Sequence, residues 1–254
     1  MEIGFPNNPR KNLIKEINWI AKHGFDFVDL FLEEDKASKN KINVPEVKKV
    51  IKKYGLGTVG HTAWYLPIGN PIESLRNAAI KEIKDYLEIF SKLEVEYVTV
   101  HSDWFLGLFN IKECIKFQTE SLEKICEDAK DYGIKIMLEM SDNKANTINN
   151  ISNILKEVKG LYLHLDLGHL NLMVDKPEDY IKRFKNKLRH VHLHDNYAEK
   201  DLHLPIGCGN LELEKILRVL KKYYDRTITL EVFSKDRDYA LLAKEKLRKL
   251  WNKL

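Results

Sequence analysis

The stretch RHVHLHDNYAEKDLHLPIGCGN, residues 189–210, contains four of the chain's nine histidines within 14 positions. Its first part alternates: His190, His192 and His194 share one parity, while Val191 and Leu193 take the other. Side chains of a β-strand point alternately to opposite faces. The pattern therefore predicts a strand with imidazoles on one face and apolar residues on the other. Strands buried on both faces are typical of parallel sheets covered by helices.

Short β-branched or apolar runs of this kind recur along the chain, separated by amphipathic stretches with helical periodicity. They predict strands at 2–5, 25–33, 57–62, 96–101, 134–140, 161–168, 190–195 and 227–233. The helical pattern is clearest at 72–93 and at 110–133, where Gly133 is a candidate C-cap. Eight βα units in 254 residues predict an α/β fold, a single (β/α)8 TIM barrel, with a doubly wound open sheet as the alternative. No linker interrupts the series, so residues 1–254 are expected to form one domain.

Polar residues fall at the C-terminal ends of the other predicted strands. In LYLHLDLGH, residues 161–169, His164 and Asp166 oppose three leucines, and Glu231 opposes its apolar neighbours in the last strand. Three further strands end on His61, His101 and Glu139, and the following loops add His169, Asp201 and His203. Enzymes with this barrel hold their active sites at the C-terminal face, so these side chains are predicted to meet there.

Carboxylates gathered in a barrel mouth would repel and desolvate one another unless cations neutralise them. We therefore predict a metal centre built from His61, His101, Glu139, Asp166, His169, His192, Asp201, His203 and Glu231. Imidazole nitrogen and carboxylate oxygen suit Zn, Mn, Fe or Co. The number of ligands allows one to three divalent ions per chain, with Glu139 and Glu231 available as bridges. His164 and His190 are expected to be core residues hydrogen-bonded to the backbone.

The composition argues against several other classes of protein. The 42 Lys and Arg against 38 Asp and Glu are interspersed along the helices, which is typical of a solvated surface rather than a nucleic-acid patch. Three cysteines without CxxC spacing indicate no disulfide framework and fit a reducing cytosol. The sequence contains neither a run of 18 apolar residues nor a signal-peptide pattern, so we expect a cytoplasmic protein without a membrane partner.

These motifs resemble the xylose isomerase-like TIM-barrel superfamily over essentially the whole chain. This superfamily includes endonuclease IV (AP endonuclease family 2), the ketose 3-epimerases and sugar phosphate isomerase/epimerase relatives. The resemblance to endonuclease IV implies three metals, held by His61, His101 and Glu139, by Glu139, Asp166, His192 and Glu231, and by His169, Asp201 and His203. The resemblance to ketose 3-epimerases implies one metal, held by Glu139, Asp166, His192 and Glu231.

Several departures from endonuclease IV favour the sugar branch. GHTAWYLPI has Trp64 and Pro67 where endonuclease IV has Tyr and Asn, and DLGH stands where it has D-T-[CS]-H. The loop LEEDKASKN, residues 32–40, is acidic where endonuclease IV has a basic, DNA-penetrating segment. Those carboxylates would repel a phosphodiester. DLGH and HLHDN followed by DLHLPIGCGN look more like the sugar phosphate isomerase/epimerase branch.

The favoured hypothesis is a metal-dependent isomerase or epimerase acting on a small sugar or sugar phosphate. The metal would polarise the substrate carbonyl and stabilise the enediolate that forms when the adjacent C–H proton leaves. Glu139 and Glu231 are the candidate catalytic residues, one removing the proton and the other returning it on the opposite face. The candidate substrate-binding residues are Trp64, Tyr65, Trp104 and His194, although the three aromatic residues could equally be packing over the barrel mouth.

The alternative is an endonuclease IV-like phosphodiesterase acting at abasic sites in DNA. Three clustered metals would generate hydroxide and clamp the attacking and leaving oxygens. The complete set of nine ligands favours this alternative, and the acidic second loop opposes it. A metal-dependent sugar-binding protein is a third, non-catalytic class. The resemblance also implies a possible homodimer.

Overall fold

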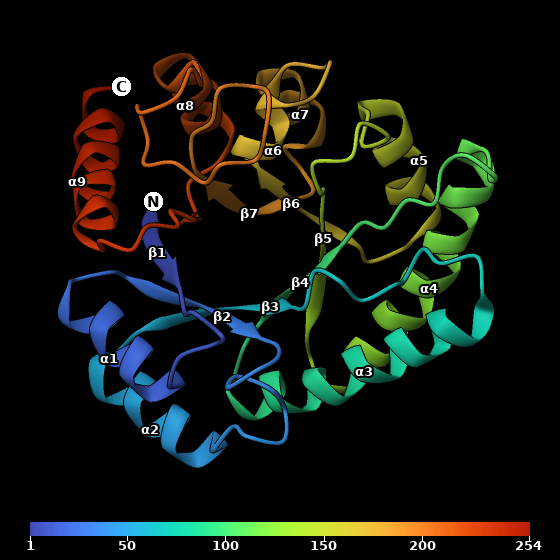
Figure 1. The fold of residues 1–254 in the computed structure, drawn as a ribbon, viewed down its shortest axis with the longest axis horizontal. Coiled ribbons are helices and arrows are strands. Elements are labelled where there is room, and N and C mark those ends of the chain that lie inside the picture. Colours follow the sequence, from blue (N-terminus) through green and yellow to red (C-terminus); the bar gives the residue numbers. More distant parts are fainter.

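The computed structural model describes residues 1–254. Eight parallel strands pair in sequence order, and β1 also pairs with β8, which closes the sheet into a barrel (Figure 1). The strands are β1 (Glu2–Pro6), β2 (Phe27–Leu32), β3 (Gly57–Thr62), β4 (Tyr97–His101), β5 (Lys135–Glu139), β6 (Tyr162–Asp166), β7 (Leu188–Leu193) and β8 (Thr227–Leu230). Every strand predicted from the sequence is present. The predicted (β/α)8 barrel is therefore confirmed, and the open doubly wound sheet is excluded.

Helices connect consecutive strands and surround the barrel (Figure 1). They are α1 (Leu13–Lys22), α2 (Val44–Tyr54), α3 (Glu73–Lys92), α4 (Ile111–Asp131), α5 (Ile148–Glu157), α6 (Leu167–Asn171), α7 (Pro177–Phe184), α8 (Leu213–Tyr223) and α9 (Asp238–Lys253). The connection between β6 and β7 holds two helices, the short α6 and then α7. None of the helices combines the length and the apolar composition that a membrane crossing requires.

Strand β6 ends two residues earlier than predicted, and the Asp166 side chain explains why. Its Oδ1 accepts hydrogen bonds from the backbone N–H groups of Gly168 at 2.7 Å and His169 at 3.0 Å. This N-cap satisfies donors that the start of a helix leaves free, so α6 begins directly after the strand. The turn keeps His169 at the C-terminal face, where its Nδ1 lies 2.9 Å from the carbonyl oxygen of Met140.

The alternation of side chains separates two environments. Outward-facing apolar residues of the strands pack with the helices in one large buried cluster. Inside the barrel, Phe27, Val59 and Met137 form a small apolar cluster of their own. Two residues further along each of these three strands, the inward side chain is polar: Asp29, His61 and Glu139. The barrel interior therefore changes from apolar to charged toward its C-terminal face.

Candidate metal centre

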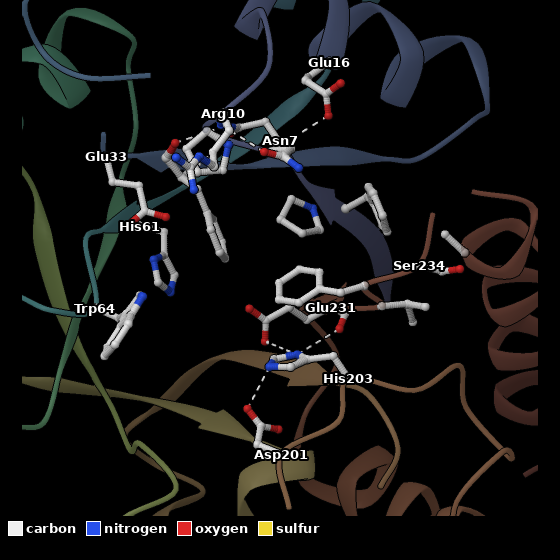
Figure 2. Close-up of a pocket in the computed structure, with 18 of the residues that line it drawn as sticks. Asn7, Arg10, Glu16, Glu33, His61, Trp64, Asp201, His203, Glu231 and Ser234 are labelled. Atoms are coloured by element: carbon white, nitrogen blue, oxygen red, sulfur yellow. Dashed lines mark hydrogen bonds and ion pairs between the residues drawn. The ribbon is translucent and has the colours of Figure 1, made fainter. Parts of the chain in front are cut away.

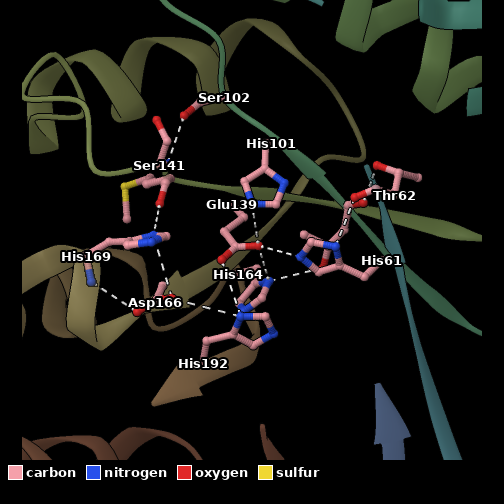
Figure 3. A network of polar contacts seen from close by, with 12 residues as sticks. His61, Thr62, His101, Ser102, Glu139, Ser141, His164, Asp166, His169 and His192 are labelled. Carbon is pink, nitrogen blue, oxygen red and sulfur yellow. Dashed lines mark hydrogen bonds and ion pairs between the residues drawn. The ribbon is translucent and has the colours of Figure 1, made fainter. Parts of the chain in front are cut away.

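The polar residues predicted to converge do lie together at the C-terminal end of the barrel (Figure 3). Five of them come from the strands: His61 in β3, His101 in β4, Glu139 in β5, Asp166 in β6 and His192 in β7. The others follow a strand: His169 in α6, Asp201 and His203 in the loop before α8, and Glu231 one residue after β8. Parallel strands present their C-terminal ends to one face, so all nine predicted ligands become neighbours. None of the nine is fully exposed.

Imidazoles surround the Glu139 carboxylate (Figure 3). Its Oε2 lies 3.0 Å from His61 Nε2, 3.2 Å from His101 Nε2 and 3.2 Å from His164 Nδ1. Two ligand atoms bound at about 2.1 Å to one tetrahedral ion are about 3.4 Å apart. The separations around Glu139 are close to that value. His61, His101 and Glu139 therefore have the spacing of a ligand set, with all their ligand atoms within 4.8 Å of one another.

His192 directs its Nδ1 at three carboxylates. This nitrogen lies 3.2 Å from Glu231 Oε2, 3.4 Å from Glu139 Oε1 and 3.9 Å from Asp166 Oδ2. It is buried and has no hydrogen-bond partner. Carboxylate oxygens around a bare nitrogen lone pair repel it, so this arrangement calls for a cation or a proton in the middle. These four residues form the ligand set that both resemblances implied.

A second cluster lies beside this one and contains a histidine that was not predicted as a ligand. Asp201 Oδ2 lies 2.7 Å from His203 Nε2 and 3.2 Å from His169 Nε2. His194 Nε2 lies 3.4 Å from Asp201 Oδ1 and 3.1 Å from Asp166 Oδ1. The ligand atoms of His169, His194, Asp201 and His203 all lie within 4.8 Å of one another. Asp166 thus joins the two clusters.

Buried atoms without a hydrogen-bond partner indicate that these residues fit a metal. Among them are Asp166 Oδ2, His192 Nδ1, both ring nitrogens of His194, and Asp201 Oδ1. Buried polar atoms are normally hydrogen-bonded, because leaving one unpaired costs about 1–3 kcal/mol. Divalent cations in the two clusters would satisfy Asp166 Oδ2, His192 Nδ1, Asp201 Oδ1 and one ring nitrogen of His194, and mixed imidazole and carboxylate donors suit Zn, Mn or Co.

The electrostatics of the centre match this interpretation. Burial opposes ionisation of Glu139, but the neighbouring imidazoles hold the pKa of Glu139 well below its ordinary value, and His164 has the largest effect among them. Burial also opposes protonation of His192, yet the carboxylates of Glu139 and Glu231 raise the pKa of His192 well above its ordinary value. Burial opposes protonation of His203 as well, but the carboxylate of Glu231 raises the pKa of His203 to about 9. A metal would therefore displace protons from imidazoles as it binds.

A cavity of about 780 Å³ opens over the centre. Its lining includes seven of the nine predicted ligands: His61, His101, Glu139, His169, Asp201, His203 and Glu231. Figure 2 shows Glu33, His61 and Trp64 on one side of it, with Asp201, His203 and Glu231 together on another. A volume of this size is typical of small-molecule sites.

The four candidate substrate-binding residues lie in different environments. Trp64 lines the cavity and is 67% exposed. Tyr65 packs edge-on against Trp64, with ring centroids 5.7 Å apart, but does not line the cavity. Trp104 is buried, because its indole N–H donates to Asn146 Oδ1 at 2.8 Å and holds the ring in the core. His194 is also buried, within the second cluster. Trp104 and His194 therefore do not form walls of the cavity.

His164 and His190 are buried core residues, as expected, but side chains rather than backbone groups contact their rings. His190 Nδ1 lies 2.8 Å from Thr227 Oγ1, and its Nε2 lies 3.0 Å from Thr229 Oγ1. His164 Nδ1 lies 3.1 Å from Thr99 Oγ1. The expectation of backbone partners was wrong because the backbone groups of these strands are already paired in the closed barrel.

Asp29 in β2 is a buried carboxylate that was not among the predicted residues. It lies inside the barrel, where its Oδ2 contacts His190, His192 and Thr229. Burial opposes its ionisation, but hydrogen bonds from the two histidines outweigh burial and lower the pKa of Asp29. A signal was present in FVDLFL, residues 27–32, where Asp29 has the parity of two phenylalanines and interrupts an otherwise apolar strand.

Together, the closed barrel and the cluster of histidines and carboxylates at its C-terminal face define a TIM barrel with a candidate metal centre. The family model of the xylose isomerase-like TIM barrel matches residues 17–252, and the chain belongs to this family. The resemblance inferred from the sequence motifs is thereby confirmed.

Several relatives, sugar epimerases among them, match most of the chain. An uncharacterised protein of Methanocaldococcus jannaschii is 29% identical over 87% of this chain and 79% of its own length. The 3-dehydro-D-guloside 4-epimerase of Escherichia coli is 24% identical, with 87% of each chain covered. The crystal structure of a D-tagatose 3-epimerase-like protein has a TM-score of 0.89 and 27% identity, and the match covers 99% of this chain and 97% of the other.

The endonuclease branch is also represented among the relatives. A probable endonuclease 4 of Aster yellows witches'-broom phytoplasma is 24% identical over 73% of this chain and 71% of its own length. Family membership alone therefore does not distinguish the two catalytic hypotheses. The chemistry of the cavity has to separate them.

Proposed function

We propose that this protein is a metal-dependent isomerase or epimerase of a small sugar or sugar phosphate. The observation that carries the proposal is the convergence of three carboxylates on the unpaired Nδ1 of His192. This set lies beside a cavity large enough for a sugar. The epimerases among the relatives support the same assignment.

The four residues that would hold the metal are Glu139, Asp166, His192 and Glu231. A bound divalent cation supplies Lewis-acid polarisation of a substrate carbonyl, which makes the neighbouring C–H proton more acidic. The buried, charged floor of the cavity orients the polar end of the substrate toward these side chains. Trp64 at the cavity wall presents an apolar surface to the rest of the sugar.

Glu139 and Glu231 would carry the proton in this mechanism. Glu139 ends β5 and Glu231 directly follows β8, and these two strands are three apart in the barrel, so the carboxylates would approach a bound substrate from different sides. One carboxylate accepts the C–H proton, and the electron pair of that bond moves into the adjacent carbonyl. For epimerisation the other, in its protonated form, returns a proton to the opposite face of the same carbon; for isomerisation the proton goes to the former carbonyl carbon, while the hydroxyl proton of the first carbon moves to the former carbonyl oxygen. The substrate is rearranged without any oxidant or reductant.

One side of the cavity suits a negatively charged substituent. Arg10, Lys11 and Lys235 line it, and none of them is within salt-bridge distance of a carboxylate. They come from the loops that follow β1 and β8. Phosphate sites in TIM barrels often use the loops after strands 7 and 8; Lys235 lies in the loop after β8, and Arg10 and Lys11 follow the adjacent strand β1. We therefore favour sugar phosphates, or sugars that carry another anionic group, over neutral ketoses.

The second candidate function remains phosphodiester hydrolysis at abasic DNA. It is favoured by the gathering of two further ligand sets around Glu139 and Asp201, which could hold additional ions. It is opposed by Glu33, which follows β2 and lines the cavity, since a carboxylate at that position repels a phosphodiester backbone.

The proposal predicts that both glutamates are required for turnover. Protein loaded with Mn, Co or Zn is assayed against ketoses and sugar phosphates in deuterated water, and isomerisation and deuterium incorporation are both measured. We expect Glu139→Gln and Glu231→Gln to lower kcat by about 10²–10⁴-fold. Glu178→Gln is the matched control, because Glu178 is buried between α7 and α8 and does not line the cavity.

Full turnover by either active-site variant would exclude that residue from catalysis. Wild-type protein that nicks an abasic duplex at low salt, and that transforms no sugar of the panel, would replace the proposal with the nuclease alternative. Nicking that is absent at low salt would remove that alternative.

A further inference from the structure

Both ring nitrogens of His192 lie close to carboxylates, and only one of them faces the candidate metal centre. Its Nδ1 faces the carboxylates of Glu139, Asp166 and Glu231, as described above. Its Nε2 lies 2.7 Å from Asp29 Oδ2. This is the shortest contact that His192 makes with any carboxylate, and it lies on the side away from the cavity.

The Asp29 contact determines which ring nitrogen carries the proton. An ionised carboxylate only accepts hydrogen bonds, so the Nε2–H of His192 must donate to Asp29. In a neutral imidazole the other nitrogen, Nδ1, then keeps its free lone pair. Because metals bind the deprotonated nitrogen, this tautomer presents the correct atom to the centre.

The surroundings of Asp29 fix its own orientation. Its Oδ2 also accepts a hydrogen bond from Thr229 Oγ1 at 2.9 Å and lies 3.3 Å from His190 Nε2. Along β2 the neighbouring inward-facing residues are Phe27 and Phe31, both buried. The ring of Phe31 is nearly parallel to that of His192, at a centroid distance of 6.0 Å. In such a water-poor site a charged hydrogen bond is strong and holds the ring in one orientation.

We propose that Asp29 is a positioning residue that fixes His192 with Nε2 protonated and Nδ1 directed at the metal. The inference rests on the metal centre of the proposed function. Hydrogen-bonded carboxylates behind metal-binding histidines typically change metal affinity by 10–100-fold when they are removed. Without Asp29, the neutral ring is free to carry its proton on Nδ1. That N–H would donate a hydrogen bond to the carboxylates of the centre, and Nδ1 could no longer bind the cation.

The test uses two substitutions of Asp29 and one control. Asp29→Asn keeps an acceptor but removes the charge, and Asp29→Leu removes both at similar volume. Phe27→Leu disturbs the same strand two residues away, at a ring that packs against His190 rather than His192. Affinity for Mn, Co and Zn is measured by isothermal titration calorimetry. The tautomer of His192 is measured by ¹⁵N NMR of the imidazole nitrogens on the metal-free protein, at an alkaline pH above the raised pKa of His192, where the ring is neutral.

We expect Asp29→Leu to weaken metal binding by about 10–100-fold and to shift His192 from the Nε2–H form toward the Nδ1–H form. Asp29→Asn should lie between the wild type and Asp29→Leu, and it also serves as the test if Asp29→Leu fails to fold. Phe27→Leu should bind metal within about threefold of the wild type.

Two results would overturn the inference while leaving the proposed function intact: variants of Asp29 that bind metal as tightly as the wild type, or an unchanged His192 tautomer. If the wild-type protein itself binds none of the three metals, the proposed function fails together with the inference.

Discussion

At the scale of single residues, Gly168 shows how tightly the second cluster is packed. A Cβ added at Gly168 would lie 2.0 Å from Cε1 of the His194 ring. The backbone there cannot move away, because the N–H of Gly168 donates to the Asp166 carboxylate at 2.7 Å. We expect Gly168→Ala to lower the free energy of unfolding by about 1–3 kcal/mol, as overpacking of a core does.

Thermal unfolding of the metal-free variant, followed by circular dichroism, measures this effect. Because the clash is with the ring of His194, the double variant Gly168→Ala/His194→Ala should recover part of the loss. The double-mutant cycle is expected to give a coupling free energy of at least about 0.5 kcal/mol. Strictly additive losses would mean that Gly168 is required for a reason other than the imidazole.

The sequence was most informative about residues whose position in a strand determines their direction. His61, Glu139 and His192 could be placed in the barrel mouth because parity and strand ends are visible in the sequence. Trp104 could not be placed, since its burial depends on a hydrogen bond to Asn146, 42 positions away. The role of Asp29 was not predicted, because no residue near it in the sequence contacts its carboxylate. Only the closed barrel brings it to β7 and β8.

At the scale of elements, an ion pair between α7 and α8 gives a prediction with a defined pH dependence. Lys215 of α8 lies 2.9 Å from the nearly buried carboxylate of Glu178 in α7. Burial would raise the pKa of Glu178, but the hydrogen bond from Lys215 outweighs burial and lowers it below the ordinary value of 4.5. A carboxylate with a lowered pKa stabilises the fold above that ordinary value, and the stabilisation is lost as the pH falls through the folded-state pKa.

Glu178→Gln should therefore be less stable than the wild type at pH 7, by about 1 kcal/mol. This corresponds to a decrease in Tm of about 2–4 °C. The difference should shrink as the pH falls below about 4.5. Glu212→Gln is the control, since Glu212 pairs with the same lysine but precedes α8 and joins no second helix. A Glu178→Gln deficit that stays constant down to pH 3 would contradict the assignment to charge.

Element boundaries were predicted less well than the elements themselves. The periodicity of 2 in the strands and the helical periodicity of the connections located all eight units. The end of β6 depends instead on the side-chain cap by Asp166, which turns the chain into α6 before the apolar pattern stops. The strand therefore ends at Asp166 although the alternating pattern continues, and the helical turn that follows places His169 at the centre.

At the scale of the whole molecule, closure of the barrel explains both the fold and the site. Residues from seven of the eight strands, or from directly after them, supply Asp29 and the candidate ligands, and no single segment holds more than a part of the centre. Such a site resists prediction from local sequence, yet it follows once the strands are ordered around the barrel. The same closure leaves several buried polar atoms of the centre without partners, so the stability of the barrel should depend on what binds there.

Removal of metal is accordingly expected to destabilise the entire barrel. A ligand present at 100 times its Kd adds about 2.7 kcal/mol to the folded state, so chelation should lower Tm by roughly 5–10 °C. If residues 1–254 form one domain, differential scanning calorimetry should give a single transition with and without metal. Glu139→Gln should respond less to added Zn, Mn or Co. Two separate transitions would contradict the single domain, and a Tm that none of these metals changes would contradict the metal centre itself.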